Sequence, residues 1–431
     1  MRAIFWIIMV GAGLLSRIST AQTGVPSSDA PTIDEGQSLP ASEAPAPPSE
    51  GAPADFIAEA RALMRVIACR ESEALPEGVD PKTVERHCKE FAPKLDFYRK
   101  NYVVKAQKFL STLRTPDLPR TVVYPFGGGD LLSALTTYPE AEKIITMSLE
   151  RGGDPRGLSG LSQRRLAEIL AKMRRGAWGL LRADNSTSEN LINLEGLELP
   201  GELCFFLLAL AIHDLEPVHL RYFGIGSDGA IHYFTPADLV ELAERKAARL
   251  HYKWKNYKGS VAFSNLELGF RRKDDPPGMI RVHQHIAANL KDDFLKTDPS
   301  LLRYLETLGP VSAMTKAASY CLANPTFSMI RDYLLAHMAI LISDSSGIPP
   351  RYYKKLPFTL EAYGDFEFSL LKLRPELNEE LKKFFRKQKR RPLPFRYGYP
   401  DGRGVFHMMV ARRQPAAPPD NPTPTSPAPE H

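Results

Sequence analysis

The chain has 431 residues, 25% of them charged, and a formal net charge of +6. It contains neither a G-x-S-x-G motif nor a C-x-x-C pair, which argues against a serine nucleophile elbow and a thioredoxin-like redox centre. Residues 55–413 are the part expected to fold. This length exceeds that of a typical domain, so one large domain or two joined domains are expected.

The first residues have the pattern of a secretory signal peptide. Arg2 precedes an apolar run over residues 4–15, and small residues follow at Ser19 and Ala21, three before and one before a cut after Ala21. The run is shorter than the roughly 20 residues needed to span a bilayer, and no later stretch of the sequence is long and apolar enough. We therefore expect cleavage after Ala21 and a soluble mature chain, periplasmic or extracellular. An uncleaved membrane anchor is the alternative.

Two segments have a composition typical of disorder. Residues 22–54 are mostly Pro, Ala, Ser, Gly and acidic residues, and residues 414–431 form a similar Pro-rich tail. Such segments bury too little apolar surface to offset the entropy lost on ordering. The residues before 55 and after 413 hold two arginines and seven acidic residues, which leaves the core at +11. This charge favours an anionic partner such as an envelope component, whereas nucleic acid does not suit an exported protein.

Residues 55–117 are predicted to form a helical region, because apolar residues recur at helical spacing. Cys69 and Cys88 flank the loop between two of its helices. A helical hairpin would bring their thiols together, so we expect a disulfide in an oxidising compartment. Two free thiols are the alternative. Cys204 and Cys321 lie in apolar runs and are expected to be buried.

The next segment predicts a β-α-β unit. Thr121–Phe126 is rich in β-branched and aromatic residues and ends at three glycines. Leu131–Tyr138 has the length of a short helix, and Lys143–Leu149 reads as a second strand. A strand, a glycine turn, a helix and a further strand suggest a right-handed crossover between parallel strands.

The rest of the core mixes helical and strand patterns. Helices are expected over residues 161–181, 201–211, 300–308, 311–322 and 327–336, and strands over residues 218–223, 230–234, 260–270, 279–286 and 338–342. The expected class for residues 118–413 is therefore α/β, with a Rossmann-like, partly parallel sheet and flanking helices, preceded by the helical hairpin.

The first candidate site is the glycine turn after the first strand. The residues expected to contact a ligand there are Phe126, Gly127, Gly128 and Gly129. Asp130 and Glu150 would follow the carboxyl ends of adjacent strands, where ligands of open α/β sheets bind. The turn matches neither G-x-G-x-x-G nor G-x-x-x-x-G-K-[ST], so no cofactor is indicated. A tight turn with Asp130 as the helix cap is the alternative.

The second candidate site follows the strand predicted over residues 338–342. Asp344 would act as a base or a ligand contact, Ser345 would contact the ligand, and Arg351 would bind an anion. The alternative is a turn stabilised by Asp344, with a rigid Ile-Pro-Pro exit.

Three further patterns are less specific. His283 and His285 would share one face of a strand, as two ligands of one metal do, but no third ligand is indicated and a polar strand face is the better interpretation. Lys316 and Tyr320 would lie one turn apart on a helix, which favours an ordinary helix face. The run Lys382–Arg391 is basic, which is typical either of a contact with an anionic surface or of a solvated helix end.

Three stretches of the core form a set: Tyr124–Asp130 with Ser148–Glu150, Tyr304–Pro310 with Lys316–Tyr320, and Asp344–Pro349. Together they resemble an uncharacterised family of exported bacterial proteins, over roughly residues 120–400. The family pattern has serine at the position of Gly127, glycine at Ser148 and proline at Arg151. The resemblance implies no known activity, and Gly127 excludes a serine nucleophile at this turn.

Three classes of function follow. The leading hypothesis is an exported protein that binds a polar or anionic ligand near Asp130, Glu150 and Asp344. The second is a hydrolase that uses these carboxylates as acid–base groups on envelope glycans. The third is a structural envelope protein whose basic segment docks on an anionic surface. If the three carboxylates meet at one sheet edge, they raise at least one pKa and call for a cation, which Arg151 and Arg351 would supply.

Overall fold

The computed structural model describes residues 51–70, 75–181, 199–243, 245, 261–276, 278–318, 321–369 and 375–415. The predicted signal peptide, nearly all of the predicted leader and the tail after Pro415 lie outside these residues, as does Tyr320. Within the described ranges, no helix has the length and apolar character needed to cross a membrane.

One sheet runs through the described core, with the strand order β4-β3-β5-β6-β2-β1-β7-β8-β10-β9. The strands are β1 Thr121–Pro125, β2 Lys143–Ser148, β3 Leu215–Ile225, β4 Ile231–Tyr233, β5 Asn265–Arg272, β6 Arg281–Ala287, β7 Val311–Thr315, β8 Met338–Ser343, β9 Phe358–Gly364 and β10 His407–Arg413. From β6 to β8 neighbouring strands are parallel, and every pairing outside this group is antiparallel. The predicted α/β class with a partly parallel sheet is confirmed.

The predicted β-α-β unit is also confirmed. β1 and β2 are adjacent and parallel, with Thr121 opposite Lys143, and α4 (Leu131–Thr137) connects them. Tyr124 faces one hydrophobic core and its neighbour Val123 faces the other, as the two-residue period of a strand requires. Because both strands run in the same direction, the residues that follow them lie at the same edge of the sheet. We call this edge, where the parallel strands end, the carboxyl edge, and the opposite one the amino edge.

One predicted helix is wrong. Residues 311–322 were expected to be helical, but Val311–Thr315 forms β7, between β1 and β8. Every residue of this short strand is buried, so its partners on both sides decide its conformation and no polar alternation marks it in the sequence. Lys316 therefore follows the end of a strand, and the interpretation that placed it on a helix face is also wrong.

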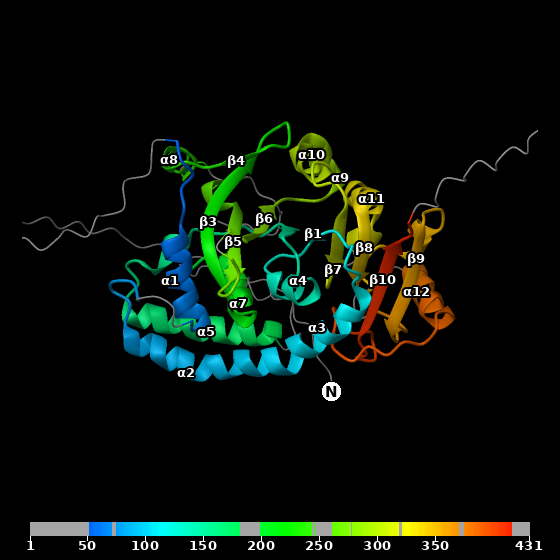
Figure 1. Cartoon of the computed structure of the whole chain (residues 1–431), viewed down its shortest axis with the longest axis horizontal. Coiled ribbons are helices and arrows are strands. Elements are labelled where there is room, and N and C mark those ends of the chain that lie inside the picture. The colour runs from blue at the N-terminus through cyan, green and yellow to red at the C-terminus, as the bar shows by residue number, and fades with distance from the viewer. Residues whose placement is uncertain are drawn as a thin grey trace, which may run out of the picture. The chain divides into compact units, whose positions relative to one another are not determined.

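Two groups of helices cover the two faces of the sheet (Figure 1). One group is α1 Ile57–Ala68, α2 Pro81–Tyr98, α3 Val104–Leu110, α4, α5 Gln163–Leu181 and α7 Gly201–Ile212. The other is α9 Asp292–Thr297, α10 Ser300–Glu306 and α11 Ser328–His337. Near the ends of the sheet order lie α8 Pro236–Ala243 and α12 Pro375–Lys387. Cys204 is buried in α7, as predicted.

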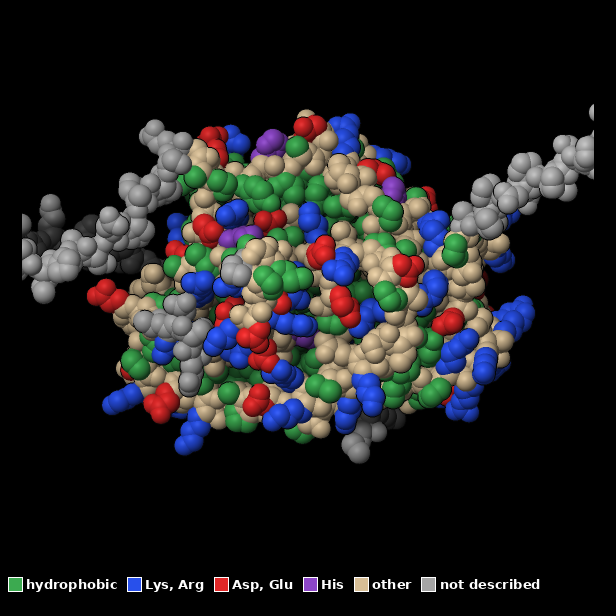
Figure 2. Space-filling model, in the orientation of Figure 1, with side chains coloured by type: hydrophobic (Ala, Val, Ile, Leu, Met, Phe, Trp, Pro, Cys, Tyr) green, Lys and Arg blue, Asp and Glu red, His purple; other side chains and the backbone are tan. Residues whose placement is uncertain are grey.

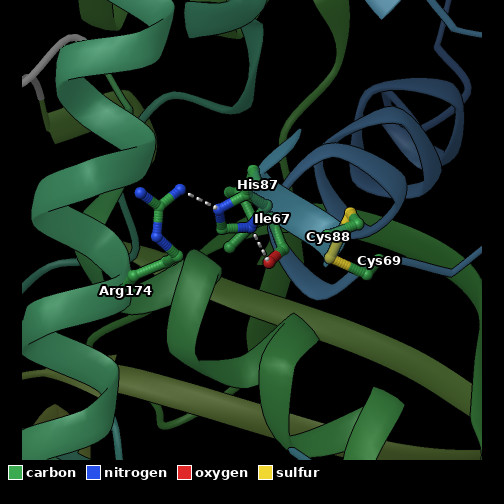
Figure 3. Close-up of a disulfide and its surroundings, with 5 residues drawn as sticks. All are labelled: Ile67, Cys69, His87, Cys88 and Arg174. Carbon is green, nitrogen blue, oxygen red and sulfur yellow. Dashed lines mark hydrogen bonds between the residues drawn. A yellow bond between two sulfur atoms is a disulfide. The ribbon is translucent and has the colours of Figure 1, made fainter. Parts of the chain in front are cut away.

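The predicted disulfide joins α1 to α2 (Figure 3). The Cα atoms of Cys69 and Cys88 lie 5.3 Å apart. The neighbouring His87 is buried: its Nε2 donates to the carbonyl oxygen of Ile67 at 2.9 Å, and its Nδ1 accepts from Arg174 at 3.2 Å. Burial lowers the pKa of His87 to about 4, so the ring is neutral at pH 7. The disulfide therefore closes a hairpin whose core is already fixed by buried hydrogen bonds.

Candidate functional site

Between the neighbouring strands β1 and β7, the connections leave in opposite directions along the sheet. From β1 the chain crosses through α4 to β2, and from β7 it crosses through α11 to β8 on the other side. The two crossover helices cover opposite faces of the sheet. In open α/β sheets, ligands bind at the carboxyl edge where such a reversal occurs. The loops at this place, residues 126–130 and 316–318, are called here the switch region.

Both loops of the switch region contain a strained residue. Phe126 has a φ of 61° and Ala317 a φ of 52°, and among the described non-glycine residues only Cys69 and Asp214 also have positive φ. Such conformations cost about 1–3 kcal/mol each and persist only where surrounding structure imposes them, which is frequent at functional sites. The ring of Phe126 contacts Phe327 edge-on, with centroids 5.4 Å apart, on the side of α11.

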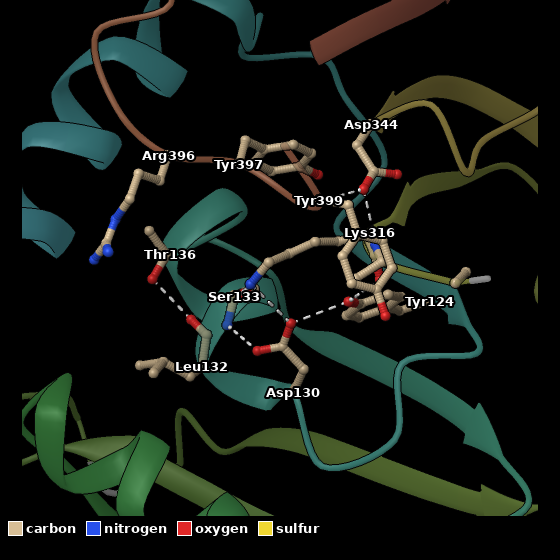
Figure 4. A network of polar contacts seen from close by, with 12 residues as sticks. Tyr124, Asp130, Leu132, Ser133, Thr136, Lys316, Asp344, Arg396, Tyr397 and Tyr399 are labelled. Atoms are coloured by element: carbon tan, nitrogen blue, oxygen red, sulfur yellow. Dashed lines mark hydrogen bonds and ion pairs between the residues drawn. The ribbon is translucent and has the colours of Figure 1, made fainter. Parts of the chain in front are cut away.

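Asp130 joins the glycine turn to α4 (Figure 4). Its Oδ1 accepts from the backbone N–H of Ser133 at 3.2 Å and caps the helix. Its Oδ2 accepts from the hydroxyl of Tyr124 at 3.1 Å and from Nζ of Lys316 at 3.2 Å. Asp130 is buried, with 6% of the residue exposed. Asp130 is thus both the predicted helix cap and one half of a buried ion pair.

Lys316 supplies the cation that the converging carboxylates call for. Besides its contact with Asp130, its Nζ donates to Oγ of Ser133 at 2.6 Å. Burial alone would lower the pKa of Lys316, but the charge of Asp130, with a smaller effect of Asp344, raises it overall. The ammonium is therefore protonated at neutral pH. A protonated lysine does not act as a base, so the Ser133–Lys316 contact is not a nucleophile–base pair.

One hydrogen of this ammonium remains available. A lysine has three N–H donors, and the described residues provide acceptors for two of them, Asp130 and Ser133. The side chain of Lys316 keeps 17% of its surface exposed. The third N–H is therefore the donor that an acceptor atom of a ligand would engage.

Asp344 lies at the same edge, but its role is structural. It is fully buried, and its Oδ1 accepts from the backbone N–H of Ser346 at 2.8 Å and from the hydroxyl of the same residue. Its Oδ2 accepts from the N–H groups of Ala317 at 3.0 Å and Tyr399 at 2.9 Å. Even a Cβ on Gly398 would collide with this carboxylate. Four donors occupy all the acceptor positions of the carboxylate, so Asp344 positions the strained Ala317 and does not face a substrate.

The other residues of the second candidate site do not join the switch region. Ser345 is buried in the turn after β8. Arg351 pairs with Glu380 of α12 and is exposed. Arg151, the other expected cation, is buried and donates to a serine hydroxyl, that of Ser264, at 3.0 Å. The prediction that Arg351 binds an anion beside Asp344 has no support in this arrangement.

A buried carboxyl group that the sequence analysis did not identify faces the glycine turn. Glu202, in the first turn of α7, is 1% exposed, and neither of its carboxyl oxygens has a hydrogen-bond partner in the described part of the chain. A Cβ on Gly129 would lie 2.5 Å from its Oε2, so the carboxyl group packs directly against the backbone of this glycine. Burial, with a smaller effect of the nearby Glu150, raises the pKa of Glu202 well above its ordinary value. Burial therefore favours the neutral, protonated form of Glu202.

The histidines of β6 share one face, as predicted. Oγ1 of Thr146 lies 2.9 Å from Nε2 of His283 and 3.0 Å from Nδ1 of His285. Nε2 of His285 donates to the carbonyl oxygen of Glu150 at 2.9 Å, so its Nδ1 accepts from Thr146, which in turn accepts from His283. Burial lowers the pKa of His285 to about 4 and that of His283 as well. The pair forms a neutral hydrogen-bonded chain, consistent with the predicted polar strand face.

Among the described residues, one group of side chains has the spacing of a metal site, namely Cys69, His87 and Cys88. Its two sulfur atoms are bonded to each other, and a disulfide sulfur is not a thiolate ligand. This group is therefore a structural crosslink.

The predicted basic run lies at the end of α12 and just after it. Lys383, Arg386, Lys387 and Lys389 have no ion-pair partner among the described residues, whereas Arg390 pairs with an aspartate at 3.3 Å. Figure 2 shows Lys and Arg side chains, in blue, gathered on the side where Figure 1 places α12.

Comparisons with protein-family models, with curated proteins and with solved structures found no match to this chain.

Proposed function

We propose that the protein binds a small polar or anionic ligand at the switch region, with Lys316 as its anchor. The observation that carries this proposal is the hydrogen bonding of the ammonium group. It is protonated, and one of its three donors has no acceptor in the described chain, on a side chain that is 17% exposed. An ammonium held by two partners is fixed in place before a ligand arrives, which reduces the entropy lost on binding.

Two further features support this place. The switch region lies where the strand order reverses, and its two loops hold strained residues, Phe126 and Ala317. Asp344 holds Ala317 in its strained conformation through a hydrogen bond of 3.0 Å. This hydrogen bond helps to hold the loops of the switch region in one conformation.

The hydrolase hypothesis has less support. Acid–base catalysis requires a carboxyl group that exchanges protons with a substrate. Asp130 is held by Lys316, Tyr124 and a backbone N–H, and Asp344 accepts four hydrogen bonds. Glu202 has its oxygens unpartnered but is buried against the glycine turn. None of these groups combines exposure with a free proton position.

We further propose that the mature protein is exported. The Arg2-to-Ala21 pattern indicates a signal peptide, and the Cys69–Cys88 disulfide suits an oxidising compartment. N-terminal sequencing of the mature protein should give Gln22 as the first residue. Intact Met1 chain free in the cytoplasm would contradict this.

Docking of the basic segment on an anionic surface stays a prediction, favoured by the unpartnered cations at the end of α12. It predicts sedimentation with phosphatidylglycerol vesicles that is lost when Lys383, Arg386 and Lys387 are changed to Gln. Equal sedimentation of both forms would contradict it.

Native mass spectrometry of the purified full chain tests ligand binding at the switch region. The wild-type protein should carry a small molecule that Lys316→Met loses. The matched control is Lys82→Met, which removes an exposed lysine at the start of α2 and should keep the ligand. A ligand retained equally by both variants, or the absence of any bound molecule in the wild type, would contradict the proposal.

A further inference from the structure

A pocket of about 390 Å³ opens at the amino edge, across the sheet from the switch region. Its lining includes Pro139, which precedes β2, and Leu215, which begins β3. It also includes Arg272, the last residue of β5, and Arg281, the first residue of β6. Leu215 pairs with Arg272 in the sheet, so these residues come from neighbouring strands at one edge. The volume falls in the range of about 300–1,000 Å³ that is usual for small-ligand sites.

The floor of this pocket is apolar. Leu135 of α4, Ile212 of α7 and Leu215 of β3 line it, and each is 2% exposed. Val103 and Val104 add apolar surface, and Val104 is exposed. An apolar group that enters the pocket would therefore bury surface against side chains that are already fixed by the core.

The charged residues that line the pocket are four cations, Arg99, Arg272, Lys273 and Arg281, and two carboxylates, Asp214 and Asp274, so positive charge is in excess. Arg99 pairs with Asp214, which also binds Arg70 at 2.8 Å. Arg281 pairs with Asp275 at 3.2 Å and donates to a backbone carbonyl. These arginines are thus satisfied within the chain.

Two cations of the rim are not satisfied. Arg272 and Lys273 line the pocket, and in the part of the chain that the structure describes neither side chain has a hydrogen-bond or ion-pair partner. Burial lowers the pKa of His213 to about 4, and the charges of Arg99 and Arg272 add to this. Both guanidinium groups therefore act on the same imidazole, so like charges converge at the mouth of the pocket.

The backbone at this place is strained as well. Asp214, in the turn between α7 and β3, has a φ of 53°. The two arginines that its carboxylate binds come from the end of α1 and from just after α2. The strained turn is therefore fastened to the helical hairpin, which holds Arg99 at the rim.

We propose that this pocket binds an amphiphilic anion: a molecule with one anionic head group and an apolar body. The head group would lie at the rim and accept hydrogen bonds from Arg272 and Lys273, and a guanidinium matches the two oxygens of a carboxylate in particular. The apolar body would lie on the floor formed by Leu135, Ile212 and Leu215. This site is independent of the switch region, because the two lie at opposite edges of the sheet.

Decanoate is the probe for this proposal, and acetate is its head-group control. Isothermal titration calorimetry of the full chain should show decanoate binding and much weaker acetate binding, because acetate buries almost no apolar surface. Arg272→Gln should weaken decanoate binding about tenfold, as loss of a charged hydrogen-bond pair does. The matched control is Arg271→Gln, which removes the same charge one position earlier on β5, where the side chain points to the other face of the sheet.

Two results would overturn the proposal: no decanoate binding by the wild-type chain, or equal weakening in Arg271→Gln and Arg272→Gln. A second variant guards against effects on folding. Val104→Glu places a carboxylate at the exposed rim and should also weaken decanoate binding, since it repels the head group and competes for the arginines. Unchanged binding in this variant would count against the assigned orientation of the ligand.

Discussion

At the carboxyl edge of the sheet, the ammonium of Lys316 lies 3.2 Å from the carboxylate of Asp130. At the amino edge, Arg272 has no carboxylate partner among the described residues. The first cation is largely enclosed and the second is exposed. The two edges therefore differ in how a positive charge is neutralised. The charge of Lys316 is paired within the chain, whereas that of Arg272 interacts with solvent or with a ligand.

This difference has a physical reason. A charge that is removed from water needs a partner, because the desolvation of an isolated buried ion costs several kcal/mol. Lys316 lies under the glycine turn and is paired, while the exposed Arg272 keeps its hydration. A change to Lys316 or Asp130 should therefore cost stability, whereas a change to Arg272 should cost almost none.

The largest change in the free energy of unfolding is expected on acidification. His285 near the carboxyl edge and His213 at the amino edge both have a pKa lowered from 6.5 to about 4. Between these values the unfolded chain binds protons that the folded chain does not, so the free energy of unfolding falls as the pH drops from 6.5 towards 4. The fully buried His285 alone should lower the free energy of unfolding by about 3 kcal/mol between pH 6.5 and pH 4.

Urea unfolding at pH 7, 5.5 and 4 measures this. His285→Gln cannot take up a proton at this position and should reduce the pH dependence by the share of His285, while His87 and His213 keep theirs, whatever the substitution does to stability at pH 7. A variant with the full pH dependence of the wild type would contradict the assignment.

Removing the carboxylate of Asp344 should be next in size. Asp344→Ala leaves four donors without their acceptor and should cost about 4 kcal/mol of unfolding free energy. Asp130→Asn keeps a residue that caps helices well, but it leaves the ammonium of Lys316 without its carboxylate and should cost about 2 kcal/mol. Chemical denaturation of both variants decides the matter, and an equal cost would remove the distinction drawn between the two aspartates.

The disulfide should contribute slightly less to the free energy of unfolding than the carboxylate of Asp344. The bond between Cys69 and Cys88 closes a loop across a sequence separation of 19. A loop of this size contributes about 3 kcal/mol by constraining the unfolded chain. The double variant Cys69→Ala/Cys88→Ala should lose this amount in denaturation, and the wild type under reducing conditions should lose a similar amount. Two alkylatable thiols in the native wild-type protein would refute the bond itself.

The smallest effect is expected at the amino edge. Arg272→Gln should change the unfolding free energy by no more than about 0.5 kcal/mol, as surface substitutions usually do. It should raise the pKa of His213, because one of the positive charges that lower it is gone, and it should leave His285 unchanged. NMR titration of the imidazole signals measures both. A His213 pKa that does not move would place Arg272 away from the pocket.

Local sequence predicted the first half of the carboxyl edge. The β-branched run of β1, its glycine turn and β2 predicted the parallel pair, and their common direction predicted that Asp130 and Glu150 follow strands that end at the same edge. The switch itself was not predicted, because β7 is five residues long and buried throughout, and it resembles a helix segment when read alone. Strand β10 carries no clear alternation either, since it is buried between β8 and β9.

The partners of the site residues were beyond local reasoning. Lys316 lies 186 residues from Asp130 in sequence, and Glu202 meets the glycine turn only because α7 packs against α4. The need for a cation was predicted from like-charge repulsion, but the sequence offered Arg151 and Arg351 before Lys316. The resemblance to a family of exported bacterial proteins stays a prediction.

The most direct test of the central claim is a crystal structure of the protein as purified, inspected at Nζ of Lys316. We expect non-protein electron density larger than a water molecule, with an acceptor atom about 3 Å from Nζ, opposite the contacts to Asp130 and Ser133. A protein group bonded to the third N–H would contradict ligand binding at Lys316, as would water alone there after native mass spectrometry has detected a bound molecule.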